Sequence, residues 1–235
     1  MPKWFEIKAQ TETAPAEVYI YDYIGYYGVE AKAFIDALNA LDADEIHLRL
    51  NTPGGSVFDG NAIYNALKRH KATITTYIDG LAASMGSIIA LAGERVIMAD
   101  NAMYMIHNPW TSAYGDAREL RKTADTLDRL RSSMLSIYQK KTEIDEESLA
   151  AMLDNETWLS ATECVEHGFA DETAEGLQAA AYFTLDKFQG YRNIPARWVA
   201  SAPPANPEKK PAEDVQSYNH RTPLYARLTE IAARA

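Results

Sequence analysis

The chain is poor in the residues that several classes of protein require. It has one cysteine, Cys164, so no disulfide can form within it, which suits a reducing compartment. Its 23 Lys and Arg residues are outnumbered by 33 Asp and Glu residues, and a formal net charge of −10 offers no basic face to a nucleic acid. No apolar run approaches the ~18 residues of a membrane span, and no basic-then-apolar signal opens the sequence. We therefore expect a soluble, cytoplasmic protein that binds neither nucleic acid nor membrane.

The chain also lacks the residue groupings that hold metal ions. No cluster of His, Cys, Asp and Glu has the spacing of a metal site, so we expect neither a metal ion nor another cofactor. Cys164 falls in a short expected helix and is interpreted as a small buried apolar residue, not as a nucleophile.

The most informative segment that is present runs from Gly80 to Gly86, with the letters GLAASMG. It places Ser84 among small residues, where an expected strand leads into an apolar helix. A hydroxyl is a weak nucleophile that needs a base to accept its proton and dipoles to stabilise the developing charge. The free N–H groups at a helix start supply such dipoles. A simple helix cap is the alternative role for this serine.

Two further segments could complete such a site. His107 ends a short apolar run, MIHNP, and the pKa of an imidazole lies near neutral pH, as a general base requires. The turn 51–56, NTPGGS, follows an alternating stretch at 45–50 that indicates a buried strand. Its paired glycines allow a sharp turn with exposed N–H groups that can donate to an oxyanion. Taken singly, each segment is also typical of an ordinary turn.

Together the three segments resemble the Clp-type serine peptidases, the ClpP-like family within the ClpP/crotonase superfold. That family shows an Asn-Ser/Thr-Pro-Gly-Gly turn, an Ala-Ser-Met-Gly nucleophile turn and a Met-Ile-His-Gln/Asn-Pro segment, in the order found here. A fourth block at 158–171, WLSATECVEHGFAD, is similar to the family's aromatic-Leu-Ser-Ala-x-Glu-Ala-x-Glu-Tyr-Gly-Leu-x-Asp. The resemblance covers residues 16–173.

The resemblance implies roles for particular residues. Ser84 is the implied nucleophile and His107 the implied general base. The backbone N–H groups of Gly54 and Met85 are the implied oxyanion hole, with Gly55 shaping the turn.

The third member of the implied triad is open between two carboxylates. The family usually has an aspartate two residues before the aromatic residue of the fourth block, and here that position holds Glu156. A glutamate can orient a histidine as an aspartate does, with one more methylene to place. Asp154 lies close by in the sequence and is the competing candidate. We favour Glu156.

Alternating strand and helix patterns predict an α/β fold, with helices covering a largely parallel sheet. The glycine turn and Ser84 both follow strands, so they can converge on one cleft at the carboxyl ends of the sheet. The resemblance implies a superhelical stack of β-β-α units with a projecting handle helix. We expect strands at 18–24, 45–50, 73–79, 95–98, 102–106 and 169–171, and helices at 29–41, 60–68 and 87–92.

One long helix is predicted between 115 and 141. Apolar residues recur there in steps of three and four from Ala117 to Tyr138, over about 25 residues and roughly 37 Å. An amphipathic helix packed on its own core is one interpretation. The resemblance favours a handle that meets its counterpart from another subunit. It implies a homo-oligomer, in heptameric rings that are single or stacked.

We expect three parts along the chain. Residues 1–175 form the ClpP-like peptidase domain and residues 176–193 its C-terminal extension. Residues 194–235 are rich in Ala, Pro and charge, which predicts a flexible tail with a weak helix pattern near its end.

The leading functional hypothesis is a self-compartmentalising serine endopeptidase with a Ser-His-acid triad, with or without an ATPase. A Pro/Ala-rich extension resembles phage head-maturation (prohead) proteases, which cleave capsid, scaffold or portal proteins. The alternative is a housekeeping Clp proteolytic subunit that serves a chaperone ATPase. More remote alternatives are a crotonase-type acyl-CoA enzyme and an inactive ring-forming assembly protein.

Overall fold

The structure is a computed structural model that describes residues 5–25, 30–175 and 191–195. Its strands are β1 (Phe5–Lys8), β2 (Ala16–Ile20), β3 (Glu45–Thr52), β4 (Thr73–Ala83), β5 (Arg95–Ala99), β6 (Met103–Ile106), β7 (Thr157–Ser160) and β8 (Glu172–Ala174). Its helices are α1 (Ala31–Asn39), α2 (Val57–Arg69), α3 (Met85–Ala90), α4 (Ala117–Lys141), α5 (Glu146–Asp154) and α6 (Ala161–Glu166).

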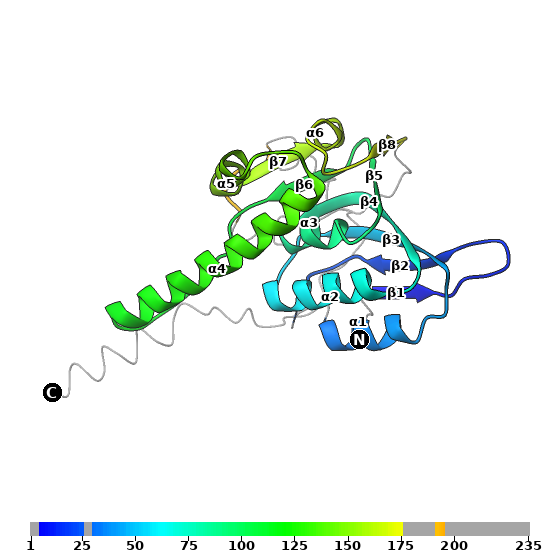
Figure 1. The fold of residues 1–235 in the computed structure, drawn as a ribbon, viewed down its shortest axis with the longest axis horizontal. Coiled ribbons are helices and arrows are strands. Elements are labelled where there is room, and N and C mark those ends of the chain that lie inside the picture. Colours follow the sequence, from blue (N-terminus) through cyan, green and yellow to red (C-terminus); the bar gives the residue numbers. More distant parts are fainter. Residues whose placement is uncertain (1–4, 26–29, 176–190, 196–235) are drawn as a thin grey trace, which may run out of the picture. The chain divides into compact units, whose positions relative to one another are not determined.

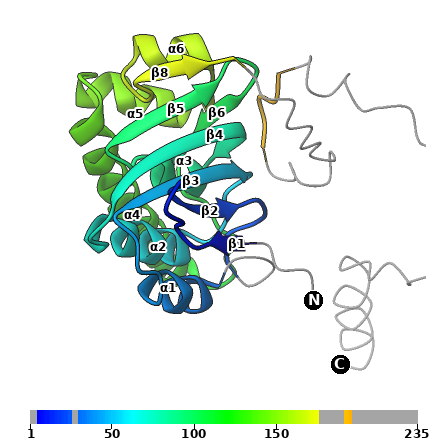
Figure 2. The same ribbon diagram turned by 90° about the vertical axis from the view of Figure 1, so that its right-hand side faces the viewer.

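The strands form one sheet in the order β1-β2-β3-β4-β5-β8, with β6 paired to β4 and β7 paired to β6. Five strand pairs are parallel, namely β2–β3, β3–β4, β4–β5, β5–β8 and β4–β6. The β1–β2 and β6–β7 pairs are antiparallel. Helices α1, α2, α3 and α4 lie on one side of the strands (Figure 2). The expected α/β class with a largely parallel sheet is confirmed.

Strand β4 carries two neighbours on one edge. Its first half pairs with β5 through Thr75–Ile78, and its last residues, Leu81–Ala83, pair with β6. The sheet therefore forks at the end of β4, immediately before Ser84. We expected this strand to stop at residue 79, but its pairing with β6 extends it to Ala83.

Other expected elements differ in detail. The expected strand at 169–171 is a loop that leads into β8, and β1, α5 and β7 were not expected. Ser160 and Glu163 form a capping box at the start of α6, and Cys164 is fully buried in that helix. Burial raises the pKa of the Cys164 thiol, which leaves it protonated and inert.

Helix α4 extends away from the sheet (Figure 1). Its 25 residues match the expected length, and Asp116 and Glu119 form a capping box at its start. Only Met134, Leu135 and Tyr138, near its end, are buried, and Ile137 packs against the core. Among the described residues, the first half of the helix makes no core contact. The arrangement of α4 agrees with the expected projecting handle helix. It disagrees with the other interpretation, a helix packed along its whole length on the core of its own chain.

The expected extension and tail lie almost entirely outside the described residues, apart from 191–195. Within the described part of the chain, no helix combines the length and apolar character that a bilayer crossing needs.

Candidate active site

Ser84 lies at the fork of the sheet, between β4 and α3. Its φ of +53° is one of two positive values among the described non-glycine residues, and such strained positions concentrate at functional sites. Its side chain makes no capping hydrogen bond to α3, so the simple helix-cap role is not what the structure shows. Instead Ser84 Oγ lies 2.8 Å from Nε2 of His107.

The pairing of β4 with β6 brings His107 to this serine. Ala83 and Met105 are partners in the parallel ladder, and the Ser84 N–H donates to the Met105 carbonyl at 2.9 Å. His107 follows β6 directly and is buried. Burial lowers the pKa of its imidazole, against the opposing effect of the Glu156 carboxylate, while nearby Arg192 lowers it further. The ring is therefore neutral at neutral pH, as a proton acceptor must be.

Glu156 and Asp154 have different surroundings. Glu156 is buried, has the other positive φ, +49°, and raises the pKa of His107 through its charge. Asp154 has a side chain that is 58% exposed and forms an ion pair with Arg131 of α4 at 2.8 Å. Asp154 also accepts a hydrogen bond from Asn108 at 2.7 Å. The structure thus brings Glu156 to the site and engages Asp154 in a network beside it.

The glycine turn lies against Ser84 and tolerates no side chain there. A Cβ on Gly54, whose φ is +90°, would meet the Ala83 carbonyl oxygen at 2.5 Å and Ser84 Cβ at 2.7 Å. The Gly54 N–H, however, donates to Thr52 Oγ1 at 3.0 Å. Among the described residues the Gly55 N–H has no acceptor, and Gly55 lines the cavity beside Ser84. The Gly54 N–H, which is the expected oxyanion donor, is thus engaged by Thr52 in this structure, whereas the Gly55 N–H is not.

A cavity of about 250 Å³ opens beside the serine and the histidine. Its walls come from the glycine turn, the start of α2 and the segment after His107. The lining residues are Tyr23, Gly55, Ser56, Val57, Ser84, His107, Pro109, Trp110 and Tyr191. The exposed Trp110 makes one wall of this cavity apolar.

Tyr191 is a site residue that the sequence did not reveal. Its ring lies 5.4 Å from that of His107, and its hydroxyl donates to the Pro53 carbonyl. Burial raises the pKa of its phenol, while a hydrogen bond with Ser84 opposes that shift. Tyr191 lies beyond the resembling region, and no motif surrounds it, so no sequence signal could have found it.

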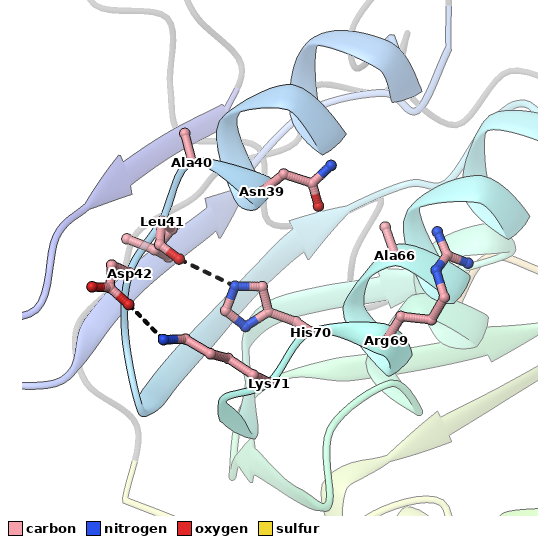
Figure 3. A pocket seen from close by; sticks show the side chains of 8 residues that line it. All are labelled: Asn39, Ala40, Leu41, Asp42, Ala66, Arg69, His70 and Lys71. Carbon is pink, nitrogen blue, oxygen red and sulfur yellow. Dashed lines mark hydrogen bonds and ion pairs between the residues drawn. The ribbon is translucent and has the colours of Figure 1, made fainter.

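A second cavity, of about 380 Å³, lies between the C-terminal ends of α1 and α2 (Figure 3). His70 lines it, but both ring nitrogens are engaged, with the Leu41 carbonyl and the Ala72 N–H. Asp42 and Lys71 form an exposed ion pair there. His70, Asp42 and Lys71 are therefore engaged, and we assign no catalytic role to this cavity. The described residues contain no cluster that could hold a metal ion.

A buried neutral histidine that bonds a strained serine, beside free N–H groups and an open cavity, defines a serine hydrolase. A family model described as Clp protease matches residues 27–176, more than half of the chain. The chain therefore belongs to the Clp protease family and is a ClpP-like serine endopeptidase.

Individual relatives agree with the family. A protein of Leuconostoc citreum (strain KM20), named ATP-dependent Clp protease proteolytic subunit, is 37% identical over 131 residues, which cover 54% of this chain and 66% of the relative. A protein of the same name from Streptococcus pneumoniae (strain Hungary19A-6) is 36% identical over 143 residues, covering 59% of this chain and 72% of the relative. The chain thus aligns with slightly less than two thirds of the first relative and with more of the second.

Proposed function

We propose that this chain is the proteolytic subunit of a Clp-type protease, in which Ser84 is the nucleophile, His107 the general base and Glu156 the third member of the triad. The observation that carries the proposal is the 2.8 Å contact between Ser84 Oγ and His107 Nε2 at the strained end of β4. No helix cap or ordinary turn requires that contact.

The reaction follows from this arrangement. Nε2 of His107 accepts the Ser84 proton as Oγ attacks the carbonyl carbon of the scissile peptide, and the carbonyl oxygen becomes an oxyanion. The imidazolium then gives the proton to the leaving amine, which departs and leaves an acyl-serine. A water molecule, deprotonated by the same nitrogen, attacks the acyl carbon. The bond from that carbon to Oγ breaks, the imidazolium returns its proton to Ser84 Oγ, and the acyl product leaves as a carboxylic acid.

The oxyanion would be held by two backbone N–H groups. Met85 is the first residue of α3, where N–H groups have no partner within the helix. The Gly55 N–H supplies the second donor in our proposal, in place of Gly54. Removing one such donor typically costs about 10²–10³ in kcat.

We further propose that the chain works in a ring with a Clp-type ATPase. The relatives' names specify ATP-dependent proteolytic subunits, which favours this housekeeping role over the phage head-maturation role that we expected first. The projecting part of α4 supports an assembly, because apolar Leu120 is 45% exposed and Leu127 is only half-buried among the described residues. Heptameric rings, their stacking and a superhelical arrangement of β-β-α units belong to the same proposal.

A fluorophosphonate probe tests the chemistry directly, because it labels only an activated serine. We expect labelling of the wild-type chain, mapped to Ser84, and none in Ser84→Ala. Peptidase activity should fall by about 10³–10⁶ in that variant, with the oligomeric state unchanged. Peptidase activity near the wild-type value in Ser84→Ala would show that the nucleophile is another residue. An unlabelled wild-type chain would favour the inactive assembly protein.

A further inference from the structure

Residues 191–195 lie beyond the region that matches the family model, yet they contact three parts of the site. The matched region ends at residue 176. The hydroxyl of Tyr191 donates to Pro53 in the glycine turn, and its ring packs beside His107. The next two residues contact Glu156.

The contacts with Glu156 are the most specific of these. Its Oε1 accepts the backbone N–H of Arg192 at 2.7 Å and that of Asn193 at 2.8 Å. The Trp158 indole N–H donates to the same oxygen at 3.3 Å. Two of the three donors therefore come from outside the family region.

The same short segment is anchored independently of Glu156. The Asn193 side-chain amide donates to the Asn155 carbonyl at 2.7 Å. Ile194 and Tyr191 pack against a small apolar cluster formed by the end of β4 and by β6, comprising Leu81, Ala83, Met103 and Met105. These contacts fix the position of the two N–H donors relative to the strands that carry Ser84 and His107.

The Glu156 carboxylate requires contacts that hold it in one orientation. Glutamate has one more rotatable bond than the aspartate usual at this position, so its carboxylate has more orientations to lose. Its backbone is also strained, with φ at +49°. Hydrogen bonds from fixed N–H groups stabilise the ionised carboxylate and select one orientation.

We propose that residues 191–193 are a positioning element of the catalytic site, which holds the Glu156 carboxylate through two backbone N–H groups and supports His107 through the Tyr191 ring. This inference rests on the proposed function, since it assigns a role within the same triad. Tyr191, Arg192 and Asn193 are positioning residues here, because they act through Glu156 and His107.

Several groups affect the protonation of His107. Glu156 favours the imidazolium, Arg192 opposes it, and Ser84 and Tyr191 pack beside the ring. If the carboxylate loses its fixed place, its support for the imidazolium weakens. The pKa of His107 then falls, and the acid limb of the pH profile moves to lower pH.

The test uses the full chain with a proline that removes one donor. Asn193→Pro deletes the N–H that bonds Glu156, whereas the matched control Asn193→Ala keeps this N–H and loses only the side-chain amide. We expect Asn193→Pro to lower kcat by about 10- to 100-fold, the usual cost of a misplaced catalytic group, with KM nearly unchanged. The acid limb of kcat/KM should move to lower pH. Asn193→Ala loses one anchor of the segment but keeps the N–H that bonds Glu156, so it should lower kcat clearly less than Asn193→Pro does.

A double-mutant cycle separates positioning from a general structural effect. In a Glu156→Gln background, Asn193→Pro should slow fluorophosphonate labelling of Ser84 much less than it does in the wild type, because its target carboxylate is gone. Three results would each overturn the proposal: losses of labelling rate that add up in the double variant, an unchanged kcat in Asn193→Pro, or a higher activity in that variant. A higher activity would mean that the segment blocks the site instead of positioning Glu156. A wild-type chain that is not labelled at Ser84 would instead defeat the proposed function.

Discussion

The two candidate carboxylates can be distinguished by a pair of nearly isosteric substitutions. Glu156→Gln removes a buried negative charge beside His107, while Asp154→Asn removes an exposed one. The buried charge stabilises the imidazolium that forms when Ser84 gives up its proton. The glutamine side chain would also replace one carboxylate oxygen, an acceptor, with an NH₂ group, which is a donor. If this NH₂ group faced the backbone N–H groups of Arg192 and Asn193, those donors would lose their acceptor.

The expected magnitudes differ by orders of magnitude. Replacing the triad acid by its amide costs about 10⁴ in kcat in a well-studied serine protease, and we expect about 10²–10⁴ for Glu156→Gln. That range corresponds to about 2.7–5.4 kcal/mol of barrier height. The ion pair between Asp154 and Arg131 is partly exposed, and such pairs contribute about 0–1 kcal/mol. Asp154→Asn should therefore change kcat by less than about fivefold.

The assay is steady-state hydrolysis of a fluorogenic peptide, with kcat and KM determined separately for both variants and the wild type. Size-exclusion chromatography with light scattering checks that each variant keeps the wild-type assembly. If Asp154→Asn lowered kcat more than Glu156→Gln in equally assembled proteins, the reasoning from burial and charge would be refuted and Asp154 would take the role.

Two further predictions concern pH and assembly. The acid limb of kcat/KM should lie below the ordinary histidine pKa of about 6.5, because burial lowers the pKa of His107 and activity needs its neutral form. Arg192→Ala removes a positive charge that opposes the imidazolium, so it should move this limb to higher pH. A limb above about 6.5 in the wild type would contradict the assignment of His107 as the base. Replacing Leu120 and Leu127 on the projecting part of α4 with Glu should split the assembly into smaller, less active species, as measured by light scattering. The control Arg121→Glu, on the same helix, should leave the assembly intact. A wild-type chain that is an active monomer near 26 kDa would refute assembly through α4.

The sequence predicts the fold class and most strands and helices, because apolar periodicity reports which face of each element is buried. It also points to Ser84 and His107, since both stand in short motifs at strand ends. It cannot choose between the N–H groups of Gly54 and Gly55, because that choice depends on whether Thr52 Oγ1 engages one of them.

The contribution of Tyr191, Arg192 and Asn193 could not be predicted either. Asn193 lies 37 residues beyond Glu156 in the chain, and its contact uses a backbone N–H group that every residue except proline possesses. No residue type marks such a donor. A motif search detects side chains with unusual chemistry, whereas this part of the site is assembled from ordinary backbone groups by tertiary contacts.

The fork at the end of β4 makes hydrolysis a sensitive indicator of correct refolding. Three residue pairs, from Leu81 to Ala83, join β4 to β6. Together with the hydrogen bond from the Ser84 N–H to the Met105 carbonyl, they align the nucleophile strand with the histidine strand. A slip of one residue in that short ladder would turn every side chain of β6 to the opposite face and carry the imidazole away from the hydroxyl. Recovered helix content and a recovered hydrodynamic radius would not detect such a misaligned species. Recovery of fluorophosphonate labelling after dilution from denaturant would therefore count only the molecules in which this ladder has formed in register.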